Sequence, residues 1–87
     1  MMLEIKYHNK HEALKRVTEL ADEIISERSS VYQDNWALMS FNSLLYAAAY
    51  KIERALYTTE SRKKLDDVID ALNYLRFAAI RLLGDEK

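Results

Sequence analysis

Apolar residues recur every three or four positions along three segments of the chain, which is the spacing of one face of an α-helix. The first segment runs from about Lys10 to Ser29. Asn9 is a suitable N-cap for it, so residues 1–9 are expected to form an arm before the helix. The apolar stripe of this helix is made of Leu14, Val17, Leu20 or Ala21, and Ile24.

A polar break separates the first helix from the second. Residues 29–41, SSVYQDNWALMSF, interrupt the periodicity because Ser, Asn and Asp cluster around Trp36, and this pattern predicts a loop. The second helix is expected to start near Ser40 or Asn42 and to end at about Tyr57. Its core stripe is predicted to comprise Leu38, Phe41, Leu45, Ala48, Ala49, Ile52 and Leu56.

A third helix is predicted from about Glu60 to Leu83. Thr58 or Thr59 can cap its start, and Gly84 stands where a left-handed residue often ends a helix. At about 100° per residue, one face of this helix is wholly apolar and is expected to be its core face. That face consists of Leu65, Val68, Ile69, Leu72, Leu75, Ala79 and Leu83.

Composition agrees with an all-α fold. The chain has 87 residues, which is enough for one domain, and it contains one glycine and no proline, which favours helices over strands. We therefore predict a small bundle of three principal helices over residues 1–87. A chain this short buries only about 60–65% of its unfolded surface, so a lone monomer would be marginal. Apolar and aromatic surface left over on the second and third helices predicts a homo-oligomer, a dimer or larger.

Charge and cysteine content narrow the functional classes. The net charge is −1 and charges of both signs are interspersed, so duplex nucleic acid is not an expected partner. No apolar run approaches the roughly 20 residues of a membrane span, and the start of the chain lacks the apolar core of a signal peptide, so we expect no membrane and a cytoplasmic location. The absence of cysteine excludes disulfides, thiolate zinc sites and a cysteine nucleophile.

The predicted second and third helices each carry a second, semi-polar face. On the third helix it contains Asp66, Asp70, Asn73 and Phe77, with Asp67, Tyr74 and Arg81 beside them. On the second helix, Tyr46, Tyr50, Glu53 and Tyr57 align at spacings of four, three and four. Aromatics between acids are unusual on a merely solvated face. Such a face predicts a binding pocket, an oligomer interface, or both.

Two aspartates on the third helix are candidate metal ligands. Asp67 and Asp70 lie one helical turn apart, so both carboxylates can approach one point, and Glu53 could add a third. Hard cations such as Mg²⁺ prefer oxygen ligands of this kind. The alternative is a solvated or salt-bridged face in which the aspartates pair with Arg62, Lys63 or Arg81.

Residues 67–79, DVIDALNYLRFAA, resemble the third-helix signature of the MazG-like, all-α nucleoside triphosphate pyrophosphohydrolases. Residues 41–56 resemble the second helix of that family, which carries a Glu-x-x-Glu motif, and residues 28–36 are similar to its tryptophan-containing segment after the first helix. The likeness is closest to the short phage-type branch, the nucleotide-modification-associated domains, and covers about residues 20–83.

The resemblance implies a helical protein that cleaves a (d)NTP to a monophosphate and pyrophosphate with Mg²⁺, or alternatively Mn²⁺. It assigns catalysis and metal binding to Glu53, Asp67 and Asp70, with Asp66 as a substitute for the fourth carboxylate of the family. Tyr50 stands where the family has the first glutamate of Glu-x-x-Glu, and this departure favours a catalytically inactive relative of the family.

Nucleotide contacts follow from the same resemblance. Lys51, Arg54 and Arg81 are candidates for phosphate binding, and Trp36, Tyr46 and Tyr50 for stacking on a base. The remaining predicted nucleotide-binding residues are Asn73 and Tyr74. The alternative function is that of a catalytically inactive helical oligomer that binds a nucleotide or a protein partner.

Overall fold

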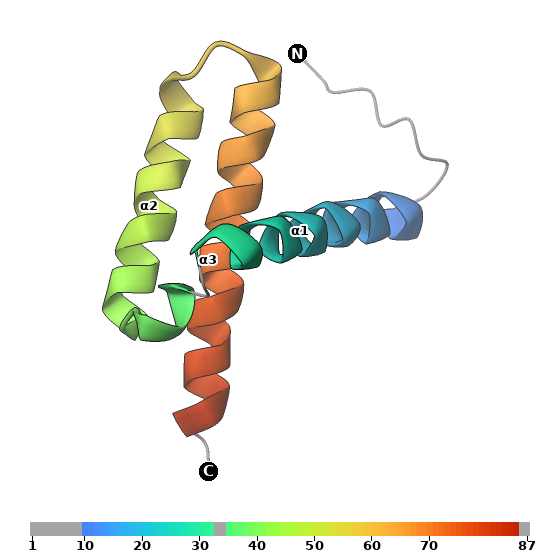
Figure 1. The fold of residues 1–87 in the computed structure, drawn as a ribbon. Helices are drawn as coiled ribbons and strands as arrows, with labels where there is room; N and C mark the ends of the chain where they lie inside the picture. Colours follow the sequence, from blue (N-terminus) through green and yellow to red (C-terminus); the bar gives the residue numbers. More distant parts are fainter. Residues whose placement is uncertain (1–9, 33–34, 86–87) are drawn as a thin grey trace.

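The computed structural model describes residues 10–32 and 35–85. They form α1 (Lys10–Tyr32), the short 3₁₀ helix η1 (Asn35–Leu38), α2 (Phe41–Tyr57) and α3 (Ser61–Asp85), as Figure 1 shows. Every element in these ranges is helical and the three long helices pack together, which confirms the all-α prediction. The predicted arm and the Asn9 cap lie outside the described residues.

The ends of α2 follow from its sequence. Ser40 precedes the helix in an extended conformation, and its hydroxyl accepts a hydrogen bond from the Ser43 backbone N–H at 3.1 Å, as an N-cap should. At the other end, the Thr58 N–H donates to the Arg54 carbonyl at 2.9 Å. Thr58 therefore closes α2, and because α3 begins at Ser61, neither of the two predicted caps, Thr58 and Thr59, directly precedes it.

Three further boundaries differ from the prediction. α1 continues to Tyr32 instead of ending at Ser29, and η1 forms within the predicted loop. Gly84 lies inside α3 and does not adopt the left-handed conformation expected of it. α3 therefore continues past Gly84 to Asp85.

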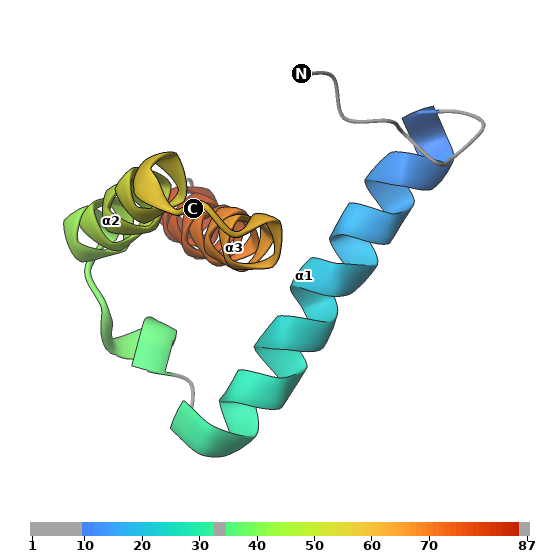
Figure 2. The same ribbon diagram turned by 90° about the horizontal axis from the view of Figure 1, so that it is seen from above.

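α2 and α3 lie side by side as an antiparallel pair, and their mutual packing is the most extensive in the molecule (Figure 1). α1 lies across α3 instead of along it, and Figure 2 shows that it passes on one side of the α2–α3 pair. No helix in the described ranges is long and apolar enough to cross a membrane. The aspartates of α3 meet α1 and α2 where these three helices come together.

The buried apolar residues of the described ranges are small in number and mostly small in size. They are Ala21, Leu44, Ala48, Ile69, Ala71 and Ala78. Leu44 and Ile69 are the largest of the fully buried side chains. Ala21, Ala48 and Ile69 belong to the predicted stripes. A core made mainly of alanines brings the helices close together but buries little apolar surface.

The predicted core face of α3 is mostly exposed, and this corrects the sequence analysis. Leu65, Val68 and Leu75 are 48%, 52% and 44% exposed, whereas Asp70 is 4% and Asn73 6% exposed. The polar face of α3 points inward because α1 and α2 provide cations and a backbone carbonyl for its side chains. Because these cations neutralise the carboxylates, the free-energy cost of burying the polar face falls. The apolar face of α3, with its leucines, is then left exposed to solvent.

The predicted stripes of the other two helices are also only partly buried. On α2, Ala48 is buried as expected, but Leu45, Ile52 and Leu56 are exposed, and Leu38, which was assigned to the same stripe, lies in η1 and is also exposed. On α1, Leu20 and Ile24 are half-buried, and Leu14 and Val17 are exposed. The single chain therefore leaves much of its periodic apolar surface in contact with solvent.

Candidate functional site

Asp70 is buried between α1 and α2 and is flanked by a cation from each. Its Oδ1 lies 2.7 Å from Arg28 Nη1, and its Oδ2 lies 3.2 Å from Lys51 Nζ. The Lys51 side chain is itself mostly buried, at 19% exposure, whereas Arg28 is half exposed. Three helices thus meet at one carboxylate. Because Lys51 and Asp70 are mostly shielded from water, their attraction is screened less than that of a surface pair, and it offsets part of the cost of burying the carboxylate.

Asp67 lies one turn before Asp70 and is equally buried, at 3% exposure. Its Oδ1 is 3.7 Å from Arg54 Nε, and its Oδ2 has no hydrogen-bond partner in the described ranges. Asp70 Oδ1 also lacks an aligned hydrogen bond, although Arg28 is close. A buried carboxylate oxygen without a donor is costly. Asp67 Oδ2 is therefore suited to a cation or to a further donor, whereas both oxygens of Asp70 already lie beside cations.

Asn73, one helical turn after Asp70, forms a hydrogen bond between α3 and α1. Its Nδ2 donates to the Ala21 carbonyl at 3.1 Å, and its Oδ1 accepts from Arg76 Nη1 at 3.0 Å. Arg76 in turn pairs with Asp22 at 2.7 Å. The amide of Asn73 is thus engaged in positioning the helices, and a nucleotide contact would have to replace these bonds.

Glu53 does not join the aspartates. It is exposed and lines an open pocket of about 350 Å³ together with Tyr50, Arg54, Tyr57 and Thr58. Two residues along a helix correspond to about 200°, so Glu53 points nearly opposite to Lys51, which faces Asp70. Within residues 10–32 and 35–85 no three acidic or histidine side chains gather at a point where they could hold a metal ion. The expected three-carboxylate pocket is not found there.

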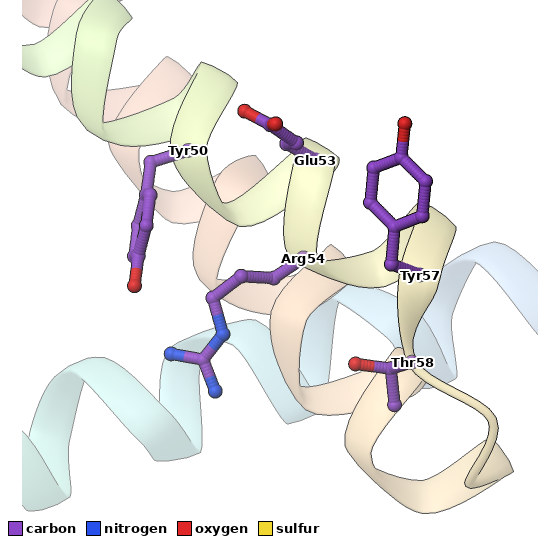
Figure 3. A pocket seen from close by; sticks show the side chains of 5 residues that line it. All are labelled: Tyr50, Glu53, Arg54, Tyr57 and Thr58. Atoms are coloured by element: carbon purple, nitrogen blue, oxygen red, sulfur yellow. The ribbon is translucent and has the colours of Figure 1, made fainter.

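Arg54 connects that pocket to the aspartates. Its Nε is the partner of Asp67, and its guanidinium carbon lies 5.8 Å from the centroid of the Tyr50 ring. In Figure 3, Tyr50 and Arg54 point to one side of α2, and Glu53 and Tyr57 to the other. Tyr50 and Tyr57 are 58% and 79% exposed, so their rings are accessible to a ligand.

Trp36 is engaged in packing. Its ring stacks on Phe77 of α3, with centroids 4.2 Å apart and planes 4° from parallel. Arg81 reinforces the contact because its Nη2 donates to the carbonyls of Ala37 and Met39, the latter at 2.8 Å. η1 is thus fixed to α3, and the guanidinium predicted to contact phosphate or the aspartates is used here.

The remaining predicted residues lie around this centre. Asp66 is exposed on α3, away from the buried pair, and Tyr46 is 78% exposed on α2. Tyr74 is half-buried. None of the three is brought into contact with Asp67 or Asp70 by an interaction that the structure shows.

Sequence reasoning missed Arg28 as a partner of Asp70. Arg28 belongs to the charged face of α1, and 42 residues separate it from Asp70, so no periodicity links the two. The sequence offered only indirect evidence for this pair. An aspartate buried on a packed helix needs a cationic partner, and that partner can be an arginine or lysine of another helix.

No family model, no curated protein and no solved structure matches this chain.

Proposed function

We propose that the protein is a Mg²⁺-dependent nucleoside triphosphate pyrophosphohydrolase that holds the ion with Asp67 and Asp70, with Mn²⁺ as an alternative ion. One observation carries the proposal. Two aspartates on successive turns of α3 are both buried; Asp67 Oδ2 has no partner in the described ranges, and Asp70 lies in ion pairs with Arg28 and Lys51.

The donor set fits Mg²⁺ in its usual form. This ion is commonly bound by one or two carboxylates, with water and substrate phosphates completing the shell. Asp67 and Asp70 supply two carboxylates one turn apart, so Glu53 is not needed as a ligand. Glu53 points to the side of α2 opposite to Tyr50 and Arg54 (Figure 3).

Three cations surround the pair and suit a polyphosphate. Arg28, Lys51 and Arg54 lie within ion-pair distance of the two carboxylates. If an ion neutralised the aspartates, these side chains would be released to donate to phosphate oxygens. Arg28 and Arg54 are half exposed and can turn with little cost, whereas Lys51 is held in place.

The pocket beside Arg54 is where the rest of the nucleotide would lie. Tyr50 offers an exposed ring for stacking on a base, and Arg54 reaches both that ring and Asp67 (Figure 3). When bound, the ion would offset charge that develops as water cleaves the α–β phosphate linkage. The chain itself orients the triphosphate with its cations and holds the base at the pocket.

The test is a panel of (d)NTPs with Mg²⁺ or Mn²⁺, scored for monophosphate and pyrophosphate. Asp70→Asn should lose turnover by about 100-fold or more, because a neutral amide is a far weaker ligand. Asp66→Asn is the matched control, since Asp66 is an exposed aspartate on the same helix. Equal loss in both variants, or no turnover by the wild type, would defeat the enzymatic proposal.

A second candidate is a catalytically inactive helical oligomer that binds a nucleotide or a protein partner. It is favoured by the ion pairs themselves, because Arg28 and Lys51 already neutralise Asp70 and the fold needs no metal. The displacement of Glu53 and the exposed leucines of α2 and α3 agree with it. Nucleotide binding without turnover, unaffected by Mg²⁺, is the expected result in this case.

A further inference from the structure

α1 buries little apolar surface against the rest of the molecule. Among residues 10–28 of this helix, Ala21 is the one buried side chain. The larger aliphatic side chains of the same stretch are half-buried or exposed, and Leu14 is 64% exposed. Burial of an alanine contributes much less free energy than burial of a leucine. The docking of α1 on α3 therefore depends strongly on polar contacts.

Polar contacts to α1 come from one side of α3. Asp70, Asn73 and Arg76 follow one another at intervals of three residues, so their side chains lie near one another on that helix. Asn73 donates to a backbone carbonyl of α1 at 3.1 Å, and Arg76 pairs with Asp22 of α1 at 2.7 Å. Asp70 pairs with a cation of α1, and this third contact differs from the other two because its acid is the buried partner.

Arg28 occupies the position that a solute cation would take at Asp70. Its Nη1 lies 2.7 Å from Asp70 Oδ1, and its side chain is 48% exposed, so water and ions reach it. The other oxygen of Asp70 lies beside Lys51. A second positive group at Oδ1 would repel the guanidinium at short range. A cation that binds Asp70 there must therefore displace Arg28, and it removes one of the contacts that hold α1.

The elements next to α1 are held in place independently of it. η1 is fixed to α3 by the stack of Trp36 on Phe77 and by the hydrogen bonds of Arg81. α2 and α3 hold each other through the most extensive packing in the molecule. Figures 1 and 2 show α1 crossing α3 on one side of this pair. Movement of α1 away from α3 therefore leaves η1 and the α2–α3 pair intact.

We propose that Arg28 is an internal counter-ion that closes α1 over Asp70, so that α1 and a divalent cation compete for this carboxylate. The competition rests on the cation binding proposed above for Asp67 and Asp70. Binding of the cation displaces Arg28 and allows α1 to open. Docking of α1 weakens cation binding by the same factor, because the coupling between two binding events is reciprocal. The contact is thus autoinhibitory.

Amide hydrogen exchange in α1 measures this opening. Arg28→Met removes the charge and keeps a long, unbranched side chain. Without Mg²⁺, exchange in α1 of this variant should be roughly fivefold faster or more, with α2 unchanged, because a charge-assisted contact is lost. Arg16→Met is the matched control. Arg16 is also on α1 and is 42% exposed, but it pairs with Glu19 and Glu23 of the same helix, so exchange should stay close to that of the wild type.

The competition itself is measured by comparing MgCl₂ with NaCl at equal ionic strength. In the wild type, Mg²⁺ should accelerate exchange in α1 beyond the effect of NaCl. By titration calorimetry, the dissociation constant of Mg²⁺ should be about tenfold lower for Arg28→Met than for the wild type. The comparison of the two salts needs no substitution, so it also covers the case in which Arg28→Met does not fold.

Several results would each overturn the proposal. They are unchanged exchange of α1 in Arg28→Met, equal acceleration in Arg16→Met, no difference between the two salts, and an unchanged dissociation constant. The enzymatic proposal is assessed separately, from turnover of (d)NTPs. It fails alone if Mg²⁺ opens α1 without turnover, and the internal counter-ion fails alone if turnover occurs while Mg²⁺ leaves α1 closed.

Discussion

Lys51 Nζ of α2 lies 3.2 Å from Asp70 Oδ2 of α3, and both side chains are more than four-fifths buried. The pair lies on the face of each helix that packs inward, where an aliphatic contact would be usual. It joins the two helices that make the most extensive contact in the molecule. A charge in such a place is tolerated only with its partner.

Lys51→Met should destabilise the fold by about 2–3 kcal/mol, less than the largest losses for a broken buried pair because Arg28 remains beside Asp70. Urea unfolding measures this loss. Lys63→Met is the control, because Lys63 and its partner Glu60 are both about two-thirds exposed, and it should change stability by no more than about 0.5 kcal/mol. Similar losses in the two variants would mean that the buried pair contributes no more to the free energy of unfolding than the surface pair does.

Mg²⁺ should raise the melting temperature of the wild type in proportion to its occupancy of the aspartate pair. At ten times the dissociation constant the gain is about 1.4 kcal/mol. Asp70→Asn should lose this response, and Asp66→Asn, which alters an exposed side chain, should keep it. Calorimetry with and without millimolar Mg²⁺ separates the outcomes. An identical shift in the wild type and both variants would show that the ion binds elsewhere.

Asn73→Ala should loosen α1 without unfolding the α2–α3 pair. The substitution removes the bonds from Asn73 to the Ala21 carbonyl and to Arg76, and it should cost about 1–3 kcal/mol. Hydrogen exchange should accelerate in α1 more than in α2. Asn42→Ala, at an exposed position of α2, serves as the control. Uniform acceleration over all helices would contradict a local role for Asn73.

The Trp36–Phe77 stack can be followed by fluorescence because Trp36 is the one tryptophan of the chain. Phe77→Leu should shift the emission to longer wavelength as η1 moves away from α3, and it should cost about 1 kcal/mol beyond the lost contact area. Arg81→Met should give a similar shift, because it frees the carbonyls of Ala37 and Met39. Unchanged emission in both variants would mean that other contacts hold η1.

Short-range features were predictable from the sequence. The helical class follows from composition and from the spacing of apolar residues, and the start of α2 follows from Ser40, whose hydroxyl caps the helix three residues along. These inferences needed only local periodicity and capping chemistry.

Other parts of the site depended on the tertiary structure. Periodicity divides α3 into an apolar and a polar face, but it does not say which face meets another helix of the same chain. The burial of the polar face depends on Arg28 of α1 and Lys51 of α2, which form ion pairs with Asp70. They are 42 and 19 residues away from Asp70 in the sequence. The rotation of α2 likewise brought Lys51 inward and turned Glu53 outward. The sequence determined three amphipathic helices, and only their packing decided that the acids lie inside and the leucines outside, because carboxylates can be buried once cations from other helices neutralise them.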